Sequence, residues 1–94
     1  MDLKINYQET INVGNQVTAK TEEFKTLLSK IKNVNSNLKT VWQGTDATKY
    51  TNAVEEQTVY MEKLGEAMNE IGAFLVKVGN AYQEVSQANA NAIR

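Results

Sequence analysis

Apolar residues recur every seven positions through the first half of the chain and predict a long amphipathic helix. One series is Val17, Phe24, Ile31 and Leu38, and a second, offset by three, is Leu27, Val34 and Val41. These are the a and d positions of a heptad, which form one stripe on a helix. Asn6 is a good N-cap, and Glu9 follows it in a capping-box arrangement. We therefore expect a helix over residues 7–41.

The second half continues the heptads with a broader apolar stripe and predicts a helix over residues 47–88. Its a positions are Tyr50, Gln57, Leu64, Ile71, Val78 and Val85, and its d positions are Ala53, Tyr60, Ala67, Phe74, Ala81 and Ala88. The e positions are also apolar or aromatic: Val54, Met61, Met68, Leu75 and Tyr82. Such a stripe is wider than a two-stranded seam requires. Residues 89–94 are expected to form a flexible tail.

The turn between the two helices is expected at residues 42–46. Gly44 supplies the positive φ that ends a helix at low cost, and Thr45 or Asp46 would cap the next helix. A connection this short makes the helices antiparallel neighbours. The predicted fold class is all-α, with residues 1–94 forming a single antiparallel two-helix hairpin.

One hairpin cannot cover the broad stripe of its second helix, because an object of this size buries little core. We expect the hairpin to dimerise into an elongated four-helix bundle. Residues 7–41 carry five Lys and three Glu, a net charge of +2, and residues 46–88 carry three Lys and seven acidic residues, a net charge of −4. These opposite charges favour packing of the first helix against the second, within or between chains.

Gly65, Gly72 and Gly79 share one heptad position beside the apolar e position. Each glycine inside a helix costs ~1 kcal/mol against alanine, so three in register need a reason. We expect them to let a partner helix approach closely, so that Gly72→Leu weakens the dimer; the alternative is that they are tolerated on a surface face. The residues expected in dimer and packing contacts are Phe24, Leu28, Ile31, Leu38, Leu64, Gly65, Met68, Ile71, Gly72, Leu75 and Gly79.

Composition argues against catalysis and against binding of metals, cofactors or nucleic acid. The 94 residues include no His and no Cys, and the net charge is −1. Without His, no Ser-His-Asp arrangement forms, and without Cys there is no thiolate chemistry. Glu62, Glu66 and Glu70 follow one another every fourth residue, which is typical of a solvated acidic face. We expect no enzyme and no cofactor, but a protein that acts by binding other proteins.

The sequence shows no targeting segment. Residues 1–14 mix charged and polar side chains without the apolar core of a signal peptide. The longest clean apolar run, residues 73–76, is far shorter than the ~20 residues that cross a bilayer. We therefore expect a protein that stays in the cytosol or is exported without a cleavable leader, and membrane binding is not expected.

The motif Trp42-Gln43-Gly44 lies in the expected turn, near the middle of the chain. It makes the sequence resemble the Trp-X-Gly (WXG) family of small type VII secretion proteins, and the length and hairpin pattern extend the likeness over nearly the whole chain. The resemblance implies a homodimeric or heterodimeric four-helix bundle. It also implies export through an ESX/Ess-like type VII system of the Gram-positive type, with an adaptor, chaperone or effector role.

Many members of this family carry Tyr, three residues and then Asp or Glu near the end of the second helix. Here Tyr82 is followed at that spacing by Ser86, with Glu84 between them. The resemblance marks Tyr82, Glu84 and Ser86 as the export-signal region. The serine leaves three alternatives open: export with a partner that carries the signal, a variant signal, or no export.

Two other functions remain open, namely a cytosolic coiled-coil scaffold or assembly chaperone and a membrane-perturbing effector. Self-pairing is expected, and pairing with another WXG-like protein is the alternative. Trp42 is expected to cover the end of the bundle. Its indole ring is either purely structural or part of a cleft where the secretion machinery docks.

Overall fold

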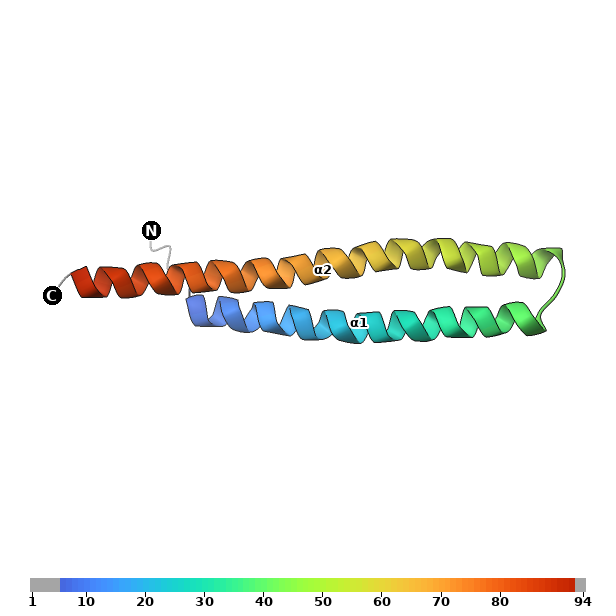
Figure 1. Ribbon diagram of the computed structural model, residues 1–94, viewed down its shortest axis with the longest axis horizontal. Coiled ribbons are helices and arrows are strands. Elements are labelled where there is room, and N and C mark those ends of the chain that lie inside the picture. Colours follow the sequence, from blue (N-terminus) through green and yellow to red (C-terminus); the bar gives the residue numbers. More distant parts are fainter. Residues whose placement is uncertain (1–5, 93–94) are drawn as a thin grey trace. The chain divides into compact units, whose positions relative to one another are not determined.

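The computed structural model describes residues 6–92, and within them it contains two α-helices and no strand. Helix α1 spans Tyr7–Val41 and helix α2 spans Thr45–Ala92. The helices run antiparallel and are joined by residues 42–44 (Figure 1). The all-α hairpin predicted from the heptad pattern is confirmed.

Helix α1 occupies the residues predicted for it, and local hydrogen bonds explain where it begins. The Asn6 side-chain oxygen accepts a hydrogen bond from the Glu9 backbone N–H at 3.0 Å. The Asn6 carbonyl accepts another from the Thr10 backbone N–H, also at 3.0 Å. These bonds occupy donors of the first helical turn and the carbonyl before it. At the other end, the Trp42 N–H donates to the Leu38 carbonyl at 2.8 Å.

Helix α2 is longer at both ends than the expected 47–88. Gly44 has a φ of 121°, so the chain reverses within residues 42–44, and Thr45 and Asp46 belong to the helix instead of the turn. At the far end the helix continues to Ala92, through residues 89–92 where a flexible tail was expected. Their alternation of Asn and Ala contains no helix breaker, and alanine is the strongest helix former. Residues 93–94 of the expected tail lie outside the described residues.

The chain divides into two compact units. The turn unit comprises Thr21–Ala67, and the terminal unit comprises Met1–Lys20 together with Met68–Arg94. Each unit contains a stretch of α1 and a stretch of α2 in contact with one another. The hairpin pairing is therefore made separately in each unit.

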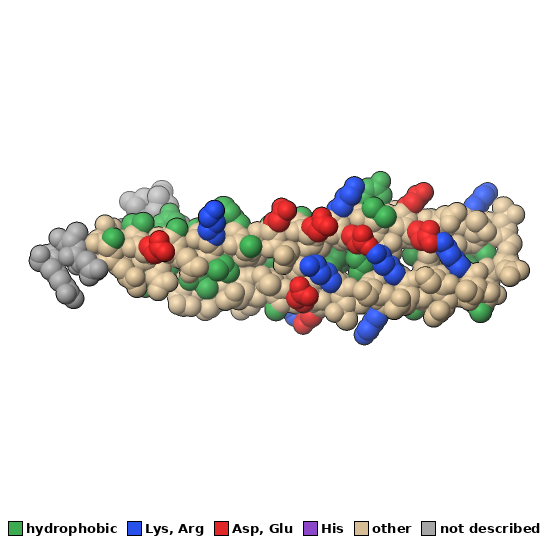
Figure 2. Space-filling view, viewed as in Figure 1, with side chains coloured by type: hydrophobic (Ala, Val, Ile, Leu, Met, Phe, Trp, Pro, Cys, Tyr) green, Lys and Arg blue, Asp and Glu red, His purple; other side chains and the backbone are tan. Residues whose placement is uncertain are grey.

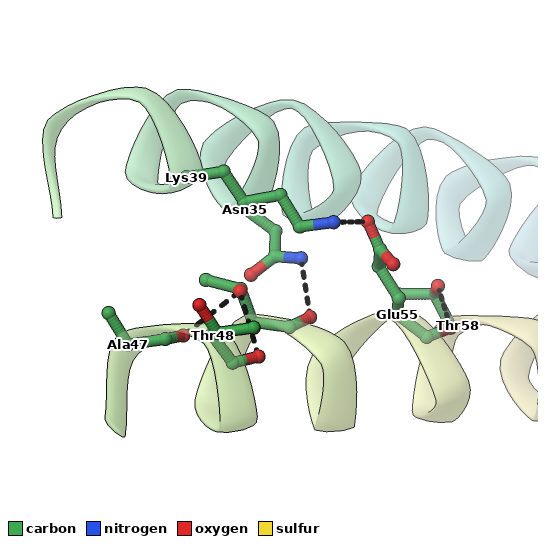
Figure 3. Close-up of polar contacts among 7 residues, drawn as sticks. Asn35, Lys39, Ala47, Thr48, Glu55 and Thr58 are labelled. Atoms are coloured by element: carbon green, nitrogen blue, oxygen red, sulfur yellow. Dashed lines mark hydrogen bonds and ion pairs between the residues drawn. The ribbon is translucent and has the colours of Figure 1, made fainter. Parts of the chain in front are cut away.

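In the turn unit the two helices meet along a seam of mostly small or polar residues. The buried residues are Thr21, Leu28 and Asn35 from α1, and Ala47, Thr51, Thr58 and Gly65 from α2. The Asn35 side-chain amide donates a hydrogen bond across the seam to the Thr51 carbonyl at 3.0 Å (Figure 3). This bond sets residue 35 level with residue 51. Seven residues further from the turn on each helix, Leu28 lies opposite Thr58. Another seven residues further, Thr21 lies opposite Gly65.

In the terminal unit, buried glycines let the two backbones approach closely. A β-carbon on Gly72 would lie 2.6 Å from the Thr18 hydroxyl oxygen and 3.0 Å from the Gly14 carbonyl oxygen. A β-carbon on Gly79 would lie 2.9 Å from the Tyr7 carbonyl oxygen. The helix that approaches these glycines is α1 of the same chain. Gly72→Leu is therefore expected to disturb the hairpin itself, and not first the dimer as the sequence suggested.

Candidate interaction surface and turn

Many large side chains of the predicted apolar stripe lie exposed, beside the seam and not within it. In the turn unit, Leu27 is 56% exposed, Val34 64% and Tyr50 66%. The other large exposed side chains at a and d positions of this unit are Val41, Tyr60 and Leu64. Contiguous apolar surface of this kind marks an interaction site more often than a free surface. The stripe is therefore available to another molecule.

An open groove of about 450 Å³ follows the stripe in the turn unit. Its walls come from both helices and consist of Leu27, Lys30, Ile31, Val34, Asn35, Leu38, Tyr50 and Val54. Apart from Lys30 and Asn35, these side chains are aliphatic or aromatic. A groove of this composition accepts the apolar face of an amphipathic helix.

The terminal unit exposes its part of the stripe as well. Ile71, Phe74 and Val85 occupy a and d positions and are all more than half exposed. Leu75, at an e position, is half-buried, and with Val13 it lines a shallow depression near the start of α1. Each unit thus combines a buried helix–helix seam with an exposed apolar surface.

The residues expected in dimer and packing contacts fall into two sets. Those buried in the seam are Leu28, Gly65, Gly72 and Gly79, and those left half-buried or exposed are Phe24, Ile31, Leu38, Leu64, Met68, Ile71 and Leu75. Gly14, Thr21 and Asn35 are also seam residues, and the heptad assignment did not predict them. Their seven-residue spacing, continuous with Leu28, was a signal that could have identified them.

Ion pairs also join the two helices of the turn unit. Lys32 pairs with Glu62. Lys39 pairs with Glu55, as Figure 3 shows. Figure 2 shows side chains of both charges along one face of the molecule. Because these side chains are roughly half exposed, each pair contributes about 0.2–1 kcal/mol. The opposite net charges of the two helices therefore act within the chain, which is one of the two alternatives left open by the sequence.

In the turn motif, Trp42 packs against the first turns of α2. The ring centroids of Trp42 and Tyr50 lie 5.9 Å apart with their planes tilted by 52°, an attractive arrangement for aromatic rings. Trp42 remains 40% exposed, and Gln43 is exposed as well. Gly44 is needed for its φ and not for space, since a β-carbon there would meet nothing within 4 Å. The motif is a tight reversal that presents part of the indole to solvent.

Tyr50→Ala is expected to shift the fluorescence emission of Trp42 to longer wavelength and to increase its quenching by acrylamide. The change removes the ring that shields one side of the indole. Trp42 is the single tryptophan of the chain, so its emission reports only on this site. Tyr60→Ala is the control, because Tyr60 is equally exposed at 65% and also lies on the apolar stripe. Equal spectra for the two variants would argue against the Trp42–Tyr50 contact.

The expected export-signal region lies on the part of α2 that extends past the start of α1. Gly79 lies beside Tyr7, the first residue of α1, and α2 continues from there to Ala92. Tyr82, Glu84 and Ser86 are all exposed. The export-signal region therefore lies beyond the point where α2 pairs with the first turn of α1.

The described residues offer little that could hold a metal ion. They contain no group of three or more His, Cys, Asp or Glu side chains arranged as ligands. Glu62, the first of the three glutamates spaced by four, is engaged by Lys32. Neither described helix has an apolar stretch of the length that membrane crossing requires.

Two antiparallel helices, a Trp-X-Gly turn and an exposed apolar stripe define a small helical interaction protein. The family model WXG100, "Proteins of 100 residues with WXG", matches residues 2–87, and the chain belongs to this family. Among solved structures the chain is similar to EsxA of Geobacillus thermodenitrificans (crystal form I), with a TM-score of 0.86 and 20% sequence identity over 95% of this chain and 99% of that chain. This likeness shows a common fold. No curated protein matches the chain.

Membership confirms the family resemblance inferred from Trp42-Gln43-Gly44. WXG100 proteins are small helical proteins associated with type VII secretion, and they act by binding partners and not by catalysis. Dimer formation and export through type VII systems are properties of the family. The chain is therefore a small protein associated with type VII secretion.

Proposed function

We propose that this chain is exported by a type VII secretion system and acts as a homodimer of helical hairpins. The observation that carries the proposal is the apolar stripe that both units leave exposed. Burial of apolar surface contributes about 25 cal/mol per Å², so covering side chains such as Val34, Tyr50 and Phe74 supplies a strong drive for association. A second hairpin presents a surface of the same kind and covers them.

A second copy of the chain fits this surface for two reasons. In a two-fold symmetric dimer the same patch lies on both sides, so an apolar stripe meets an apolar stripe. The net charge of −1 imposes little repulsion between two copies. A four-helix bundle then buries the stripe while the cross-helix pairs Lys32–Glu62 and Lys39–Glu55 stay at its surface.

The export role rests on family membership together with the exposed end of α2. Tyr82 is 45% exposed and projects from a helical segment that α1 does not cover. Such a segment is accessible to the secretion machinery. Ser86 retains a hydroxyl hydrogen-bonding group where an acidic residue is common in the family.

Export is tested by expressing the tagged chain in a bacterium with an active type VII system. We expect the protein in the culture supernatant, and its loss from the supernatant when the secretion ATPase is deleted. Tyr82→Ala should lower the exported fraction at least about tenfold without changing helicity by circular dichroism. Asn80→Ala, an exposed change in the same segment, serves as the control. Retention of the protein in the cells of both strains would contradict the proposal and favour a cytosolic scaffold.

A further inference from the structure

The charged residues of the turn unit fit two alignments of its helices. Lys25, Lys32 and Lys39 are seven residues apart on α1, and Glu55 and Glu62 are seven apart on α2. In the structure Lys32 pairs with Glu62 and Lys39 with Glu55, while Lys25 pairs within its own helix. A shift of one heptad would instead pair Lys25 with Glu62 and Lys32 with Glu55. Both alignments contain two cross-helix pairs, so the number of cross-helix pairs does not select between them.

The buried seam of the turn unit also accepts this shift. Thr58 would take the place of Gly65 beside Thr21, and Thr51 would take the place of Thr58 beside Leu28. All of the exchanged residues are small and are already buried in the present seam. The largest side chain of this seam, Leu28, would face a threonine in either alignment. The seven-residue repeat of the seam therefore does not exclude the shift.

The terminal unit allows the same change through its glycines. Gly79 now lies against Tyr7 and Ile11, where there is no room for a β-carbon. After a shift of one heptad, Gly72 would stand at that place, again without a β-carbon. The close approach of α1 to α2 at this point is preserved.

Two features of the turn unit distinguish the alignments. The hydrogen bond from the Asn35 amide to the Thr51 carbonyl exists only in the present one, since the shift would bring Asn35 beside Gly44. The turn between α1 and α2 would also move toward the N-terminus by about half a heptad, because the shift is shared between the two helices. Residues 42–44 would then become part of a helix. Gly44 would then lose its φ of 121°.

We propose that the hairpin has a second packing register, displaced by one heptad, and that the Asn35–Thr51 hydrogen bond and the Gly44 turn hold the present register. Each register contains two ion pairs between the helices, and the present one also keeps the exposed pair Lys25–Glu22. Lys39 stabilises only the present register, through Glu55, and Lys25 stabilises only the displaced one, through Glu62. These two lysines therefore have opposite effects on the equilibrium between the registers.

Distances between spin labels on α1 and α2 test the proposal. The chain has no cysteine, so Ser29→Cys and Glu66→Cys provide a unique label pair at exposed sites outside the cross-helix ion pairs. A shift of seven residues at ~1.5 Å per residue displaces the helices by about 10 Å and lengthens this distance. Dilution with unlabelled protein removes distances between chains. Pulsed electron spin resonance then resolves the two registers.

The labelled protein without further changes should show one short distance. Asn35→Leu combined with Lys39→Ala should add a longer distance, and Asn35→Leu combined with Lys25→Ala should not. Gly44→Ala combined with Lys39→Ala should also add the longer distance. Alanine disfavours the φ of 121° that the present turn requires, and it favours the helix that residue 44 would join in the displaced register. A single short distance in both Lys39→Ala combinations, with helicity retained, would overturn the proposal. So would a longer distance that is unaffected by Lys25→Ala.

Discussion

Val34→Glu is expected to convert the proposed dimer into single hairpins at micromolar concentration. Val34 lines the apolar groove of the turn unit and is 64% exposed there, so its side chain is free to be buried by a partner. The substitution removes an apolar contact of about 1–2 kcal/mol and brings a carboxylate into the interface at a cost of several kcal/mol. Because the change occurs in both copies, the dissociation constant should rise at least about 100-fold.

Sedimentation velocity or light scattering over a concentration series measures this change, and circular dichroism verifies that the helices persist. Val59→Glu is the matched control. Val59 is 50% exposed and undergoes the same change of side chain, but it occupies a c position, away from the stripe. Similar dissociation constants for the two variants would show that the groove does not lie in the interface.

Gly14→Ala and Gly65→Ala are expected to change the free energy of unfolding in opposite directions. A β-carbon on Gly14 would lie 2.8 Å from the Gly72 carbonyl oxygen and 3.0 Å from the Val76 backbone nitrogen. These are backbone atoms, which cannot move aside as a flexible side chain does. The clash should outweigh the helix-propensity gain of ~1 kcal/mol and leave a net loss of about 2 kcal/mol.

Gly65→Ala provides the comparison, because the substitution and the gain in helix propensity are the same. Its β-carbon would meet the Phe24 ring at 3.4 Å and the Lys25 Cγ atom at 3.9 Å, which are ordinary contacts with side chains, so we expect a stability gain of up to about 1 kcal/mol. Urea unfolding followed by circular dichroism measures both variants. All proteins are compared at one concentration, since dimerisation adds to apparent stability. Equal shifts of the same sign would contradict the close approach at Gly14.

The ends of the helices show where local sequence was sufficient and where it was not. The start of α1 followed from Asn6, whose side chain makes the expected cap with Glu9. Helix α2 begins two residues earlier than the sequence predicts, because Thr45 and Asp46 suit a cap as well as a first helical turn. The expected tail at residues 89–94 follows from the poor order of many chain ends, but residues 89–92 contain no helix breaker and continue α2 to Ala92.

The candidate surface was also predicted in part. The heptads identified a stripe too broad for one hairpin, and Val34, Tyr50 and Phe74 are indeed exposed. The glycine line predicts close helix packing, but the helix that the sequence analysis expects there is that of a dimer partner. In the structure the glycines face α1 of the same chain. They therefore belong to the buried seam and not to the exposed apolar stripe.

The sequence by itself determined the two helices, the reversal at Gly44, the family and the excess of apolar surface, because these depend on periodicity, backbone preference and a local motif. The tertiary structure alone decided which positions form the inner seam. A heptad repeat states which residues share a face of a helix, but not which face turns toward the neighbouring helix. Contacts such as Asn35–Thr51 make that choice, and they join residues far apart in the chain.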